Sequence, residues 1–70
     1  MKIHVGDVIG LCGEISGHKV EKVLGRGMGL EISDGRWIRL SDVYVVRTDN
    51  EDGTATETFS DGRIRTVELE

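Results

Sequence analysis

Ser33-Asp34-Gly35-Arg36 and Ser60-Asp61-Gly62-Arg63 are two copies of one tetrapeptide, and each copy lies between segments rich in β-forming residues. Asp-Gly between alternating hydrophobic residues is a strong short-range hairpin signal, because glycine adopts the positive φ that a tight strand reversal requires. The two copies therefore predict two β-hairpins and indicate a small all-β domain.

The register of the first hairpin follows from the side chains that flank Asp34-Gly35. A two-residue loop would mix apolar and charged side chains on both faces. A three-residue loop, in which Gly35 takes the left-handed conformation after a type I turn, pairs Leu30 with Ile38 and makes one face apolar. We therefore predict the three-residue loop.

The opposite face of this hairpin carries Glu31, Trp37 and Arg39, so the only tryptophan of the chain is expected to point away from the interior. Tryptophan and arginine on an outer sheet face suit ligand stacking or a protein interface, where both are favoured anchors. With Arg26 and Arg36, these residues form our candidate set for binding a ligand or partner. The purely structural alternative is that a second subunit or the C-terminal hairpin covers Trp37.

The second hairpin is barely amphipathic, and its sequence favours neither loop length. A three-residue loop pairs Glu57 with Arg65, whereas a two-residue loop pairs Phe59 with Ile64. The default expectation is a solvated extension of the sheet. The alternative is an arm that packs on a second subunit or a target.

The remaining segments complete a meander of short strands. Glycines at positions 6, 10 and 13 suit a bent first strand, because glycine permits bulges and corners. Nothing in the sequence indicates a long amphipathic helix. The expected strands are residues 3–15, 19–24, 30–33, 36–40, 43–47, 54–59 and 63–69.

Five or so short glycine-bent strands, with the turn Leu40-Ser41-Asp42-Val43 before the fifth, resemble the SH3-like small barrels over residues 3–47. The stretch Val5-Gly6-Asp7-Val8-Ile9, followed by Gly13 and Gly17, is loosely similar to the opening of KOW-type modules. The resemblance implies an SH3-like barrel of about five antiparallel strands with an added hairpin, and a module that binds nucleic acid or protein. We accordingly divide the chain into a barrel (1–47) and an acidic loop with the C-terminal hairpin (48–70), packed on the barrel or on a partner subunit.

Length and composition limit what the chain can do. A domain of 70 residues buries only about 60% of the surface that its unfolded chain exposes, so its core is thin and oligomerisation would help it. The net charge of −4 disfavours general binding to nucleic acid, which needs excess Lys and Arg. A lone cysteine, no signal peptide and no apolar run near the roughly 20 residues of a membrane span lead us to expect the reducing cytoplasm and no membrane contact.

Residues that could carry chemistry are few. The glycine-rich stretch 25–29 lacks the following helix that phosphate-binding loops use. Cys12 could act as a nucleophile beside His4 or His18, but we expect a small buried thiol in a strand. Two histidines match no metal spacing, and the acidic run at 49–52 suits a solvated loop. We therefore expect no catalytic residue, no metal and no cofactor.

Three functions stay open. The first is a non-enzymatic module that binds a protein, such as an inhibitor or adaptor of the kind that phage or accessory genes encode, and that self-associates as a dimer or higher oligomer. The second is a binder of a small anionic ligand or nucleotide at a subunit interface. The third, without residue support, is an oligomeric enzyme whose site exists only in the assembly.

Overall fold

Short antiparallel strands form one sheet in this protein. The structure is a computed structural model that describes residues 2–25 and 29–69. The hydrogen-bonded order is β4-β3-β2-β1-β5-β6-β7, so β4 and β7 are the two edges. The strands are β1 (Val8–Leu11), β2 (Gly17–Val23), β3 (Leu30–Ile32), β4 (Trp37–Ile38), β5 (Val43–Asp49), β6 (Thr54–Phe59) and β7 (Ile64–Glu68).

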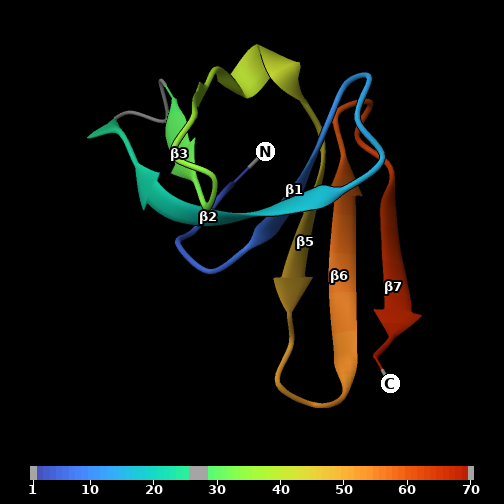
Figure 1. Ribbon diagram of the computed structural model, residues 1–70. Helices are drawn as coiled ribbons and strands as arrows, with labels where there is room; N and C mark the ends of the chain where they lie inside the picture. The colour runs from blue at the N-terminus through green and yellow to red at the C-terminus, as the bar shows by residue number, and fades with distance from the viewer. Residues whose placement is uncertain (1, 26–28, 70) are drawn as a thin grey trace.

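The sheet is strongly curved on one side and flatter on the other. Figure 1 shows β2 bending across the molecule between β1 and β3, whereas β5, β6 and β7 run side by side. A 3-10 helix, η2 (Leu40–Asp42), joins β4 to β5. The all-β prediction is confirmed, and no helix in the described part of the chain is long and apolar enough to cross a membrane.

The hydrophobic core lies inside the curve. It is thin, as expected for a chain of this length, because few large side chains are withdrawn from water. Ile3, Val23, Ile38 and Leu40 are partly buried around it. The buried cluster consists of Ile9, Leu11, Val20, Leu30, Ile32, Val43 and Val46.

The first hairpin has the predicted three-residue loop. Leu30 pairs with Ile38, and Gly35 has a φ of 89°. The Gly35 N–H donates to the Ile32 carbonyl at 2.9 Å, and the Ile32 N–H donates to the Arg36 carbonyl at 3.0 Å. This is the expected turn closed by a left-handed glycine.

The second hairpin uses the same turn, which decides between the two registers that the sequence left open. Glu57 pairs with Arg65, and Gly62 has a φ of 92°. In both copies of the tetrapeptide the arginine N–H donates to Oδ1 of the aspartate at 3.0 Å, and the arginine Nε–H donates to Oδ2 at 2.7 Å. The repeated sequence therefore builds the same local structure twice.

The first strand is shorter than predicted. The sequence suggested residues 3–15, but β1 covers only Val8–Leu11. Gly6 and Gly13 have φ values of 95° and 83°, and both lie in turns that bound the strand. Left-handed glycines end a strand rather than bend it, which explains the difference.

The C-terminal hairpin continues the sheet. The predicted division after residue 47 falls within β5, which pairs with β1 on one side and β6 on the other. β7 then pairs with β6. β4 is at the opposite edge and Trp37 on it stays largely exposed, so this hairpin does not bury Trp37.

Candidate functional site

Trp37 lies on the outer face of the sheet, as the predicted register implied. It pairs with Glu31, and Glu31 pairs in turn with Lys22 on β2, so the three side chains form a row across three strands. The tryptophan is 54% exposed, a large apolar surface to leave in water. Of the predicted set, the structure brings Glu31 and Trp37 together.

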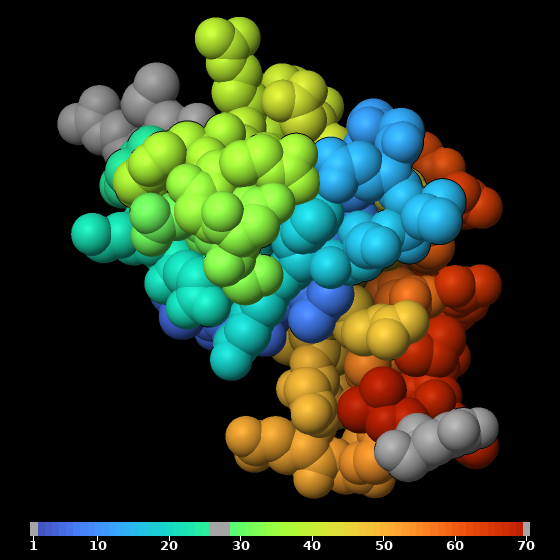
Figure 2. All heavy atoms as spheres, in the orientation of Figure 1, coloured from blue at the N-terminus to red at the C-terminus, as the bar shows by residue number. Residues whose placement is uncertain are grey.

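The Arg36 side chain is bound by two carboxylates, one in its own turn and one in the β1–β2 connection. Its guanidinium donates to both carboxylate oxygens of Glu14, at 3.0 and 3.1 Å, and to Asp34. His18 Nε2 lies 2.9 Å from Glu14 Oε1 and 3.3 Å from Arg36 Nη2. In Figure 2 the yellow-green atoms of the first hairpin lie against the light-blue atoms of the β1–β2 connection.

In this cluster of Glu14, His18, Asp34 and Arg36, the surroundings favour the ionised forms of the two carboxylates and of the guanidinium. The hydrogen bonds from Arg36 first, and from His18 second, lower the pKa of Glu14 from 4.5 to about 2. The backbone N–H of Arg36 is the main cause of the lowered pKa of Asp34. The same carboxylates raise the pKa of Arg36. Arg36 therefore links the turn of the first hairpin to the β1–β2 connection. Its positive charge is already balanced by the carboxylates of Glu14 and Asp34.

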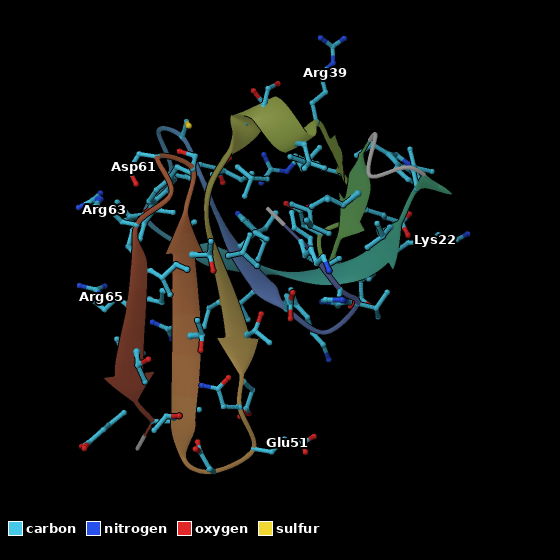
Figure 3. The ribbon with its side chains drawn as sticks, turned by 180° about the vertical axis from the view of Figure 1, so that it is seen from behind. Lys22, Arg39, Glu51, Asp61, Arg63 and Arg65 are labelled. Carbon is cyan, nitrogen blue, oxygen red and sulfur yellow. The ribbon has the colours of Figure 1, made fainter. Side chains whose placement is uncertain are left out.

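Arg39 precedes η2 and is separate from this cluster. Its side chain projects away from the sheet into solvent (Figure 3), and no salt bridge or side-chain hydrogen bond joins it to another part of the described chain. Arg26 lies outside the described residues. The predicted five-residue set is thus divided between the Trp37 row, the Glu14 cluster and the exposed Arg39.

A groove that the sequence analysis missed lies on the outer face of β1, β5 and β6. Its volume is about 400 Å³. Ile15, in the β1–β2 connection, is fully exposed at its rim, and Val8 and Tyr44 are partly exposed along it. The remaining lining residues are Ile9, Gly10, Ser16, Gly17, Val45, Arg47 and Glu57.

Two glycines form part of the groove because side chains would fill the space. A Cβ at Gly10 would lie 2.6 Å from Val45 Cγ1 and 2.9 Å from Tyr44 Cε1. A Cβ at Gly17 would lie 2.7 Å from Val8 Cγ1. The available sequence signal was Ile15, a bulky apolar residue in a stretch of glycine and serine, but only the β1–β5 pairing places it on the same groove as Tyr44.

Arg47 and Glu57 are the charged residues that line the groove. Val8, Arg47, Glu57 and Arg65 are successive cross-strand partners on β1, β5, β6 and β7. The Glu57 side chain is only 9% exposed and accepts hydrogen bonds from Arg47 at 2.9 Å and from Arg65 at 2.8 Å. These two arginines, Arg47 first, lower the pKa of Glu57.

Two arginines of the C-terminal hairpin, Arg63 and the Arg65 already described, lie over the ring of Phe59. The guanidinium of Arg63 lies 4.8 Å from the centroid of Phe59, and that of Arg65 lies 5.6 Å from it. Both distances are within cation–π range. Figure 3 shows Arg63 and Arg65 projecting from this edge of the molecule.

Cys12, the residue considered as a nucleophile, has no hydrogen bond to either histidine in the described chain. Cys12 is exposed in the turn after β1, so the expectation of a buried thiol was wrong; the chain leaves the sheet at Gly13. Asp7 instead accepts a hydrogen bond from the His4 backbone N–H at 2.9 Å. Within residues 2–25 and 29–69, no group of three or more His, Cys, Asp or Glu residues could hold a metal ion.

In the acidic loop between β5 and β6, aspartate side chains accept hydrogen bonds from nearby backbone N–H groups. Asp49 accepts a hydrogen bond from the Glu51 N–H, and Asp52 accepts one from the Thr54 N–H. No protein-family model matches this chain, and no curated protein or solved structure matches it significantly.

Proposed function

We propose that this chain is a non-enzymatic binding module that captures a protein partner through the groove of β1, β5 and β6. The observation that carries the proposal is the fully exposed Ile15 at the rim of the groove, beside the partly exposed Val8 and Tyr44. Apolar side chains gathered at a concave surface and bordered by charges are typical of interaction sites.

A protein fits this surface better than a small ligand. A molecule that only filled the groove would leave the outward-facing Ile15 in water, whereas a macromolecule would cover both groove and rim. Arg47 is 46% exposed and fixed by Glu57, so it offers an oriented donor at the polar end. Such a charged rim gives specificity around an apolar centre.

The anionic-ligand alternative has weaker support. It depended on Arg26, Arg36, Trp37 and Arg39, but Arg36 is bound by Glu14 and Asp34. The net charge of −4 likewise gives no support to general nucleic-acid binding. The Trp37 row is a second exposed surface, and we treat it as a separate contact to be tested on its own.

The biological setting is part of the same proposal. A lone cysteine, exposed in the turn after β1, suits the reducing cytoplasm. An adaptor or inhibitor such as those of phage or accessory genes needs a compact binding surface without chemistry, and the groove provides one.

The test is selection of binders from a displayed library of random peptides, followed by titration against three variants. We expect Ile15→Asp to weaken the selected peptides by about tenfold or more, because a buried hot-spot residue contributes more than 1 kcal/mol. Val5→Asp is the matched control, since Val5 is also an exposed aliphatic residue but does not line the groove. Trp37→Ala tests the second surface.

Amide chemical-shift mapping then locates the peptide. Shifts confined to Val8, Ile15, Gly17 and Tyr44 would support the groove. Equal loss of binding with Ile15→Asp and Val5→Asp, or shifts centred on Trp37, would contradict it.

A further inference from the structure

β7 is a five-residue edge strand, and no strand of the described chain pairs with its outer side. The opposite edge, β4, has only two residues and leads directly into η2. An unpaired strand edge is a template for another strand, because its outward N–H and C=O groups have no protein partner. Figure 1 shows β7 along the open side of the flat part of the sheet.

The hydrogen-bonding pattern identifies the residues of β7 that present these groups. Phe59 bonds to Arg63 at one end of the hairpin, and Leu69 bonds to Gly53 at the other. Bonded and non-bonded pairs alternate between antiparallel strands, so Arg65 and Val67 bond to β6. The backbone N–H and C=O groups of Ile64, Thr66 and Glu68 therefore point outward.

The edge also lacks the usual devices that prevent pairing. β7 contains no proline, and its pairing with β6 is continuous, without a bulge. Its one basic residue, Arg65, is paired with Glu57 on β6, and its other charged residue, Glu68, is the last of the strand. Natural edges are often blocked by unpaired lysines, prolines or bulges, and this strand has none of these.

We propose that β7 pairs in antiparallel fashion with β7 of a second copy of this chain, with Thr66 facing the partner's Thr66 on the two-fold axis. In this register all three outward residues exchange backbone hydrogen bonds, since Ile64 faces the partner's Glu68. Arg65 faces the partner's Val67. A two-fold interface requires such a self-complementary surface.

Shifting the pairing by one step loses this complementarity. If Ile64 faced the partner's Thr66, Arg65 would face the partner's Arg65, and like charges directly opposite destabilise a sheet. If Thr66 faced the partner's Glu68, Ile64 would face a position beyond the end of the partner's β7. The Thr66 register alone uses the whole edge without juxtaposed like charges.

The same register extends a row of threonines. Thr48 pairs with Thr56, and Thr56 pairs with Thr66, so the row already crosses β5, β6 and β7. Threonine pairs stabilise neighbouring strands through their hydroxyl and methyl groups. A single five-residue strand pair is small, so we expect a dissociation constant on the order of 100 µM, as for interfaces at the small end of the range.

Sedimentation velocity over a concentration series tests the dimer. Thr66→Pro removes an outward N–H without touching the β6 ladder, and we expect dimerisation to be lost. Thr66→Lys and Thr66→Glu each place like charges on the axis, so each variant alone should dimerise several-fold more weakly. Their equimolar mixture should form a heterodimer, detected by native mass spectrometry.

Ser41→Lys and Ser41→Glu are the controls, because Ser41 is exposed on η2, which does not belong to the sheet and does not pair with β7. These variants should dimerise like the wild type. A wild-type chain that stays monomeric at millimolar concentration, or a Thr66→Pro variant that is folded and still dimeric, would overturn the proposal. Failure of the Lys and Glu variants to form a heterodimer would overturn the Thr66 register.

Discussion

Gly10 lies directly opposite Gly17 across the β1–β2 pair. Neither residue occupies the space above its backbone, and Tyr44 and Val45 approach Gly10 from β5 while Val8 approaches Gly17. The groove that Ile15 lines therefore depends on having glycine, with no side chain, at both positions.

Gly10→Ala should lower the free energy of unfolding by about 1 to 2 kcal/mol, because overpacking exceeds the smaller gain from replacing a strand glycine. The added Cβ would displace the side chains of Val45 and Tyr44. It should also weaken peptides selected for the groove. Urea denaturation and peptide titration measure the two effects.

Gly25→Ala is the matched control, since a Cβ there has nothing within 4 Å. A change within about 0.5 kcal/mol is expected for such a surface position. Equal stability of the Gly10 and Gly25 variants would show that Tyr44 and Val45 relax freely, and that Gly10 does not maintain the groove.

Because the two Ser-Asp-Gly-Arg turns have the same structure, replacing the glycine of either turn by alanine should lower the unfolding free energy equally. Gly35→Ala and Gly62→Ala each place a Cβ on a residue with φ near +90° and open space around it, so strain alone determines the cost. We expect each variant to lose about 1 to 2 kcal/mol of unfolding free energy. Thermal or urea unfolding measures both, and a neutral result at either site would argue against the left-handed turn there.

The lowered pKa of Glu14 predicts that the protein loses stability in acid over a defined pH range. This pKa is lowered from 4.5 to about 2 in the folded protein by Arg36 and His18, so the ionised form favours the folded state. This contribution is fully present above pH 4.5 and is lost as the pH falls from there to about 2. Glu14→Gln should therefore flatten the pH dependence of unfolding in this window.

Glu21→Gln provides the control for that experiment, because Glu21 is exposed on β2 and forms no salt bridge within the described residues. Urea titrations at several pH values should give the Glu21 variant the slope of the wild type. If the Glu14 and Glu21 variants lose stability with the same slope, the Glu14–Arg36 contact does not hold in solution.

The turn of the first hairpin, and the face of the sheet on which each of its side chains lies, could be predicted because both depend on neighbouring residues. Asp34-Gly35 favours one loop, and the apolar pattern around it places Leu30 with Ile38 and turns Trp37 outward. The second hairpin has the same turn, but its mixed side chains left the register open from the pattern alone. The length of β1 was missed because the sequence does not distinguish a bending glycine from one with positive φ.

The sequence by itself thus determined an all-β chain, two turns and the outward face of Trp37, since each depends on neighbouring residues. Only the tertiary structure decided that β1 lies beside β5, where Ile9 meets Val46 in the core. That long-range pairing places Ile15 and Tyr44 on one groove, although they come from segments far apart in the chain. It depends on burying apolar surface between segments far apart in the chain, which no local pattern encodes.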